Sequence, residues 1–156
     1  MKKLVLALAV IAMCGLGASC SKPDANVPEK VIEYFPKVKS ISQEGSLTTV
    51  LNRKGDVLGY VLNSKPASDG IVGFKGETPL EIYFDGDKVI TKVEMLPNQE
   101  TENFANKVIN SGLLDSWNGL DYILALEKNV DVVSGATYTS KSVISTFQAA
   151  VEANMK

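Results

Sequence analysis

The sequence predicts one α+β domain, residues 29–156, in which helices cover one face of an antiparallel sheet of two hairpins. The chain has 156 residues, 45% of them hydrophobic, which is enough for one substantial core. Two pairs of short apolar runs, residues 47–51 with 57–62 and residues 80–84 with 89–96, are typical of β-hairpins. Helical patterns precede and follow these runs, and this order fits an α+β fold.

The connection inside each pair has the composition of a hairpin turn. Residues 52–56 contain a glycine, and residues 85–88 begin with Asp85-Gly86, which is among the strongest short hairpin signals. Asp85 and Asp87 could also be read as calcium ligands. The remaining ligands of a calcium-binding loop are missing, so we expect a plain turn.

Three helical segments are predicted around the sheet. Residues 29–41 place apolar side chains on one helical face, although Pro36 must end or kink that helix. A second helix is predicted from about residue 101 to 110, where a Ser-Gly pair follows. The last helix is predicted over residues 140–155, because apolar residues recur there at helical spacing and Ser140 is a favoured type of N-cap.

The N-terminus, residues 1–19, is predicted to be a secretory signal peptide. Lys2 and Lys3 stand before an uncharged stretch, residues 4–18, which is shorter than the roughly 20 residues that a membrane-spanning helix needs. A basic start and an apolar middle are typical of an export signal. We therefore expect the protein to be exported.

Cys20 follows Gly17, Ala18 and Ser19, and this arrangement resembles the lipobox of bacterial lipoproteins. The resemblance implies cleavage before Cys20 and a diacylglycerol group on it, which would anchor the protein on the periplasmic or cell-surface face of a membrane. Ordinary signal cleavage at the same bond is the alternative, since the small residues also suit that peptidase. Residues 20–28, which include two prolines, are predicted to be a tether.

The composition excludes several kinds of chemistry. The sequence has no histidine, the commonest general base and a common metal ligand. Its two cysteines, Cys14 and Cys20, both precede the domain, so the domain has no thiol nucleophile and no iron–sulfur ligand. The chain has 16 basic and 18 acidic residues and no run of basic residues, which argues against nucleic acid as a partner. Redox or catalytic chemistry must therefore come from groups other than histidine and cysteine side chains.

The segment that bears chemistry is residues 134–140, Ser-Gly-Ala-Thr-Tyr-Thr-Ser, in which five of the seven residues carry a hydroxyl. It lies where the last helix begins, and a helix N-terminus offers unpaired N–H groups to a phosphate. Residues 135–142 fail the P-loop pattern of nucleotide-binding proteins, because Ser140 replaces its second glycine.

Residues 131–140 resemble the flavinylation motif of the FMN-binding domain family, which includes the C subunit of the sodium-pumping NADH:quinone reductase and the G subunit of the Rnf complex. The similarity covers roughly residues 50–151, with further matching elements at Gly59-Tyr60-Val61, Gly73-Phe74-Lys75-Gly76, Thr78-Pro79-Leu80, Lys88-Val89-Ile90 and Glu100-Thr101. In such proteins a flavin transferase takes FMN from FAD and joins its phosphate to the threonine that ends the motif. By position that residue is Thr137.

The resemblance also implies roles for neighbouring residues. Ser134, Gly135 and Ala136 complete the motif, and the hydroxyls of Ser134, Thr139 and Ser140 would meet the remaining negative charge of the phosphate. Thr139 is the alternative attachment residue. Asp131 would help the transferase to recognise or ionise the threonine, or would simply end a strand. Glu100 and Thr101 would lie near the flavin, with Glu102-Asn103 in place of the family's usual Pro-Gly.

These observations together predict a covalent FMN protein that carries electrons between a membrane redox partner and another acceptor, because a flavin can take one or two electrons. No acid–base set for a substrate is visible, so a stand-alone enzyme is not expected. The alternatives are a non-redox binding lipoprotein that keeps the fold without flavin, and a subunit of a larger membrane electron-transport complex. Trp117, Tyr138 and Phe74 are candidates for flavin contact, and core packing is the alternative for each.

Overall fold

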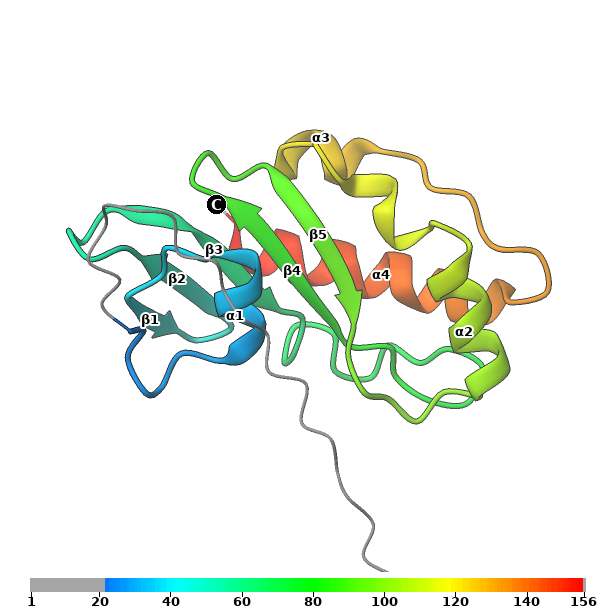
Figure 1. Cartoon of the computed structure of the whole chain (residues 1–156). Helices are drawn as coiled ribbons and strands as arrows, with labels where there is room; N and C mark the ends of the chain where they lie inside the picture. Colours follow the sequence, from blue (N-terminus) through cyan, green and yellow to red (C-terminus); the bar gives the residue numbers. More distant parts are fainter. Residues whose placement is uncertain (1–21, 156) are drawn as a thin grey trace, which may run out of the picture.

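The structure is a computed structural model that describes residues 22–155 (Figure 1). The predicted signal peptide, residues 1–19, and the predicted lipid attachment site, Cys20, lie outside the described residues. Among the helices of residues 22–155, none combines the length and the hydropathy that crossing a bilayer requires.

Five antiparallel strands form one sheet in sequential order (Figure 1): β1 Ser40–Glu44, β2 Leu47–Leu51, β3 Val57–Asn63, β4 Leu80–Asp85 and β5 Ile90–Met95. Both predicted hairpins, β2–β3 and β4–β5, are confirmed. Strand β1, which the sequence pattern did not predict, pairs with β2 in a third hairpin. Its only apolar residue is Ile41, so it lacks the apolar alternation of a half-buried strand and is held as an edge strand by backbone pairing.

The turn between β4 and β5 is stabilised by its own aspartate. Asp85 Oδ1 accepts hydrogen bonds from the backbone N–H groups of Asp87 and Val89, both at 2.9 Å. The side chain therefore serves the turn, as aspartate commonly does at this position.

The first helix is shorter than the apolar pattern predicted. Helix α1 (Glu29–Tyr34) ends at its C-cap, Phe35, so the predicted end at Pro36 is confirmed. The continuation of a helical face to residue 41 is wrong, because Val38 is buried in the loop that follows α1 and Ile41 lies in β1. The fixed φ and missing N–H of proline account for the break.

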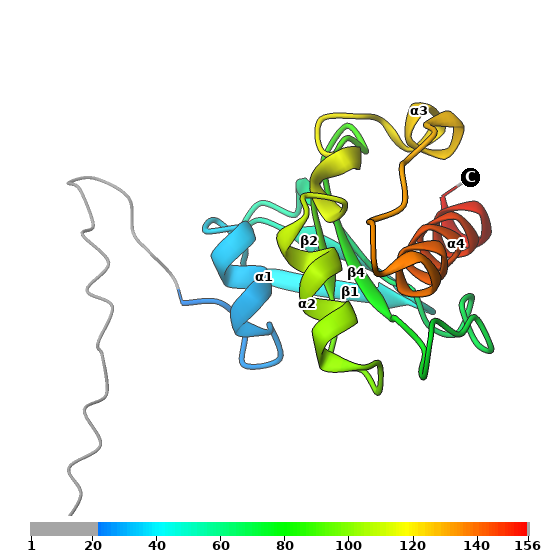
Figure 2. The same ribbon diagram turned by 90° about the vertical axis from the view of Figure 1, so that its right-hand side faces the viewer.

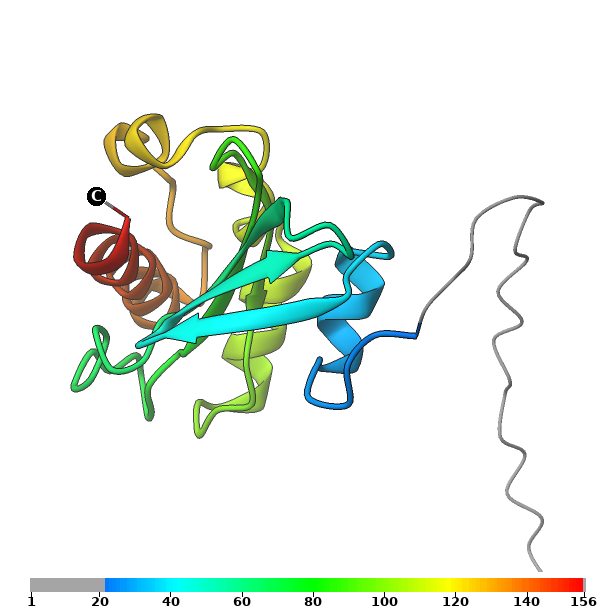
Figure 3. The same ribbon diagram turned by 90° about the vertical axis from the view of Figure 1, so that its left-hand side faces the viewer.

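The sheet is covered on both faces, and the prediction that helices cover one face is therefore wrong. Figures 2 and 3 show α1 and α4 on opposite sides of the strands. Because side chains alternate along a strand, Ile82 and Phe84 of β4 pack in the larger core with α4, whereas Tyr83 packs with Val31 of α1. The end of the predicted tether joins this smaller core, since Val27 is only 8% exposed.

The remaining helical elements are α2 (Glu102–Asn110), a short 3-10 helix η1 (Leu114–Trp117), α3 (Tyr122–Glu127) and α4 (Thr137–Asn154). Helix α2 confirms the predicted second helix. Trp117 stacks on Phe147 of α4 with ring centroids 4.0 Å apart, and both side chains are buried. This contact joins η1 to α4, and it places the only tryptophan in the core rather than on a ligand surface.

Glu94 of β5 anchors α1 to the sheet, since its carboxylate accepts hydrogen bonds from Lys30 Nζ and, at 2.6 Å, from Tyr34 Oη. Burial opposes the charge of Glu94, but these two donors outweigh it, so the pKa of the carboxyl lies below its ordinary value. A carboxyl with a lowered pKa stabilises the fold at pH values above its ordinary pKa, and this stabilisation is lost as the pH falls.

We expect Glu94→Gln to lower the free energy of unfolding by about 1 kcal/mol at pH 7. Urea unfolding at successively lower pH should show this loss becoming smaller as the carboxyl is protonated; a loss that stays equal as the pH falls would contradict this.

Candidate functional site

The predicted attachment residue, Thr137, is the first residue of α4, and its side chain is exposed. The prediction that the helix begins after an N-cap at Ser140 is wrong, because Ala136 occupies the N-cap position. Ser140 is buried in the first turn. Its Oγ donates to the carbonyl of Ala136 at 2.8 Å and accepts from the N–H of Val133 at 3.0 Å. The buried side chain of Ser140 therefore joins the preceding loop to the first turn of the helix.

The N-terminus of α4 has no cap. Alanine offers no side-chain acceptor, and the first backbone bond of the helix runs from Ser140 N–H to Ala136 O at 2.9 Å. The amides of Thr137, Tyr138 and Thr139 have no hydrogen-bond acceptor among the described residues. Unpaired amides at the positive end of an 18-residue helix favour an anion, and they fit a phosphate bonded to the first residue.

The hydroxyl groups of this segment are divided between two roles. Thr139 and Ser140, which were predicted to meet the phosphate, are fully buried, and their hydroxyls donate to Glu100 and to the Ala136 carbonyl. Ser134 and Thr137 are exposed, as is Asp131, the first residue of the motif, in the loop between α3 and α4. Of the motif's aliphatic hydroxyls, the structure thus leaves those of Ser134 and Thr137 open to an incoming group.

Glu100 lies in the core of the site and is only 8% exposed. Its carboxylate accepts three backbone N–H groups, from Phe74 at 2.7 Å, Lys75 at 2.9 Å and Thr101 at 2.8 Å. The hydroxyl of Thr139 donates to the same group at 3.2 Å. One side chain thus ties residues 73–76, the start of α2 and the first turn of α4 together, although these segments lie far apart in the sequence.

The tight turn of residues 73–76 depends on glycine. The Gly73 N–H donates to the Gly76 carbonyl at 2.8 Å. A Cβ atom at Gly73 would lie 2.1 Å from Oε2 of Glu100, closer than any real contact. Glycine is therefore required for the carboxylate to approach the backbone, and the turn in consequence holds Phe74 outward.

Three aromatic side chains surround a cavity beside Thr137. The cavity, of about 250 Å³, is lined by Phe74, Phe104, Ala136, Thr137, Tyr138 and Thr139. Phe74 packs edge-on against Phe104 with centroids 5.0 Å apart, and it lies 6.5 Å from the ring of Tyr138. Phe74 and Tyr138 are nevertheless 60% and 68% exposed. Exposed aromatic rings next to the attachment residue offer a planar ligand an apolar surface.

The fold brings to this site two residues of α2 that were not predicted from the sequence. Phe104 lines the cavity, and the ammonium group of Lys107 lies against Gly135, where a Cβ atom would be 3.1 Å from Nζ. Their positions three apart on a helix place them on one side, which is the only signal that the sequence offers. No pattern in the neighbouring sequence shows that this side of α2 faces residues 134–139.

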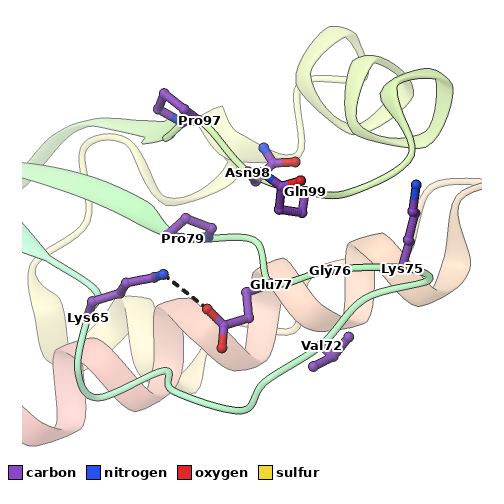
Figure 4. Close-up of a pocket in the computed structure, with 9 residues that line it drawn as sticks. All are labelled: Lys65, Val72, Lys75, Gly76, Glu77, Pro79, Pro97, Asn98 and Gln99. Carbon is purple, nitrogen blue, oxygen red and sulfur yellow. Dashed lines mark ion pairs between the residues drawn. The ribbon is translucent and has the colours of Figure 1, made fainter.

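A second cavity, of about 410 Å³, lies along the chain segments that flank the same turn (Figure 4). Lys65 and Glu77 form an ion pair across its wall, with Nζ and Oε2 3.1 Å apart. Its lining includes Lys75 and Gly76 but none of the residues of the helix N-terminus. It is therefore a separate hollow, and the chemistry of the site does not depend on it.

The protein is a small α+β domain in which an exposed threonine and unpaired helix amides suit an anionic group. Beside them, an aromatic surface suits a planar group. Residues 73–152, more than half of the chain, match the FMN-binding domain. The chain belongs to the FMN-binding domain family, as the sequence predicted, and FMN is the cofactor that this membership supports. The match begins at Gly73, so β1–β3 lie outside it. No curated protein matches the chain.

Proposed function

We propose that the protein is an exported, membrane-anchored electron carrier in which FMN is joined through a phosphoester to Thr137. The observation that supports this most directly is an exposed threonine hydroxyl at the first position of an uncapped helix, inside the residues that match the FMN-binding domain. The free amides of Thr137, Tyr138 and Thr139 would bind the phosphate oxygens.

A flavin transferase would perform the attachment. Thr137 Oγ1 would form a bond to the phosphorus atom of FAD that belongs to its FMN half. The pyrophosphate bond would break, and AMP would leave with the proton of the threonine hydroxyl. Asp131, the first residue of the motif, is exposed, so such an enzyme would be able to contact it. A covalent bond keeps the cofactor on the protein in a compartment that lacks a free flavin pool.

The aromatic surface of Phe74, Phe104 and Tyr138 would receive the isoalloxazine ring. The bound flavin would supply one- and two-electron transfer, which no side chain of the domain offers. The aromatic side chains that line the cavity would orient the ring. The exposed outer part of the site leaves room for a membrane redox partner and a second acceptor.

Intact mass of the full chain tests the attachment. Coexpression with a flavin transferase should add the mass of FMN minus water and give the visible absorbance of flavin, and digestion should place the increment on the peptide that contains Thr137. A colourless protein of unmodified mass would support the non-redox alternative and overturn the proposal. Enrichment of the chain in a stable complex of membrane proteins would assign it to a larger electron-transport complex.

The membrane anchor is tested separately at Cys20. Cys20→Ser removes the thiol that would accept diacylglycerol, so we expect the protein to move from the membrane fraction to the soluble fraction. Cys14→Ser is the matched control, because that cysteine lies inside the predicted signal peptide. Fractionation followed by immunoblotting measures the effect, and a Cys20→Ser protein that stays in the membrane would count against lipidation.

A further inference from the structure

We propose that Lys107 supplies the positive charge that pairs with the phosphate attached to Thr137; this inference rests on the proposed function. Lys107 lies in the last turn of α2, which packs beside the start of α4 (Figure 2). Its Nζ would be 3.1 Å from a Cβ atom on Gly135, which stands immediately before the N-cap of α4. The ammonium group therefore lies at the loop from which the attachment residue emerges.

Lys107 has no partner of its own within residues 22–155. The ion pairs in that part of the chain involve four other lysines, Lys30, Lys39, Lys65 and Lys92. None of the side-chain hydrogen bonds there starts from Lys107 either, whereas Lys128 donates to a backbone carbonyl. A lysine held against a neighbouring loop without an acceptor is available to an added anion.

The electrostatic interaction between Lys107 and the start of α4 changes from unfavourable to favourable when a phosphate is attached. In the unmodified protein the ammonium group lies beside the positive end of α4, where a second positive charge is unfavourable. A phosphodiester on Thr137 brings one negative charge to the same place, and a charge-assisted interaction with an ammonium group then becomes favourable. The modification would thus convert a mild repulsion into an ion pair.

A purely structural role for Lys107 makes a different prediction. A cation in the last turn of α2 also stabilises that helix through its own dipole. That effect does not involve a charge at Thr137, so a purely structural role predicts the same loss with or without flavin. The two roles are therefore separated by comparing the effect of one substitution in the two forms of the protein.

The test is a cycle of thermal unfolding on the full chain, prepared with and without a flavin transferase. We expect Lys107→Gln to lower the Tm of the flavinylated form by about 3 °C more than that of the unmodified form. Lys107→Arg should restore most of this difference because it keeps the charge. The difference should shrink in high salt, since screening weakens ion pairs that are partly exposed.

Two further lysines serve as controls. Lys54→Gln, in the turn between β2 and β3, removes the same charge far from α4 and should shift both forms equally. Lys141 follows Thr137 by one helical turn, so Lys141→Gln asks whether a neighbour on the same helix supplies the charge instead. Equal shifts of the two forms by Lys107→Gln, or a difference found only with Lys141→Gln, would overturn the inference. A wild-type chain that never gains FMN would overturn the proposed function itself.

Discussion

Thr137→Ala is expected to remove covalent FMN completely while leaving the fold intact. The substitution deletes the one hydroxyl that the proposed attachment requires, and alanine cannot form a phosphoester. Because the Thr137 side chain is exposed and makes no hydrogen bond among the described residues, the free energy of unfolding of the unmodified protein should change by no more than about 0.5 kcal/mol. Intact mass after coexpression with a flavin transferase measures the first effect, and urea unfolding measures the second.

Two neighbouring substitutions make this experiment specific. Thr137→Ser keeps a hydroxyl at the same position and should still carry FMN. Thr139→Val removes the hydroxyl of the alternative attachment residue, which is fully buried and donates to Glu100, so the increment should stay on Thr137. Attachment that persists in Thr137→Ala and disappears in Thr139→Val would assign the ester to Thr139.

The strands that the sequence predicted correctly are those with strong local signals. Hairpins β2–β3 and β4–β5 combine apolar runs with glycine-containing turns, and these features act over a few residues. Strand β1 has no such pattern, because a polar edge strand is specified by the neighbour to which it bonds. A helix was predicted before the strands, but the sequence did not show that α1 covers the second face, since its packing against Tyr83 is a tertiary contact.

The start of α4 shows where a local rule gave the wrong residue. Serine is a favoured N-cap, and Ser140 fitted that pattern. In the structure the chain turns at Gly135, which has φ +75°, and Ser140 bonds backward to Ala136 and Val133. The cap position is thereby left to alanine, which leaves the helix amides without an acceptor. This departure from the usual rule lies at the proposed attachment site, where an added phosphate would satisfy those amides.

The residues that α2 contributes to the site could not be predicted from the sequence. The motif locates Thr137, but Phe104 and Lys107 belong to a helix whose position relative to α4 depends on the whole fold. Glu100 was expected near the flavin from family resemblance alone. Its bonding to two backbone amides of the turn of residues 73–76 carries no sequence signal.

Glu100→Ala is expected to destabilise the protein by about 3 kcal/mol, because it leaves three backbone amides and the buried Thr139 hydroxyl without their acceptor. The turn of residues 73–76 should loosen most, since two of these amides belong to it. Phe74 would then no longer be held beside Thr137. In the flavinylated protein we therefore expect the ring to become more accessible to a soluble fluorescence quencher, whereas the covalent bond itself should remain.

Graded substitutions separate the hydrogen-bonding role of Glu100 from its charge. Glu100→Gln keeps one acceptor oxygen and turns the other position into an N–H donor that faces backbone donors, so an intermediate loss of stability is expected. Glu152→Ala removes the same charge from an exposed position on α4 and should change the free energy of unfolding by no more than about 0.5 kcal/mol. Urea unfolding of the three variants gives the order of stability. If Glu100→Ala proved as harmless as Glu152→Ala, the carboxylate would not hold the turn, and the aromatic surface beside Thr137 would need another support.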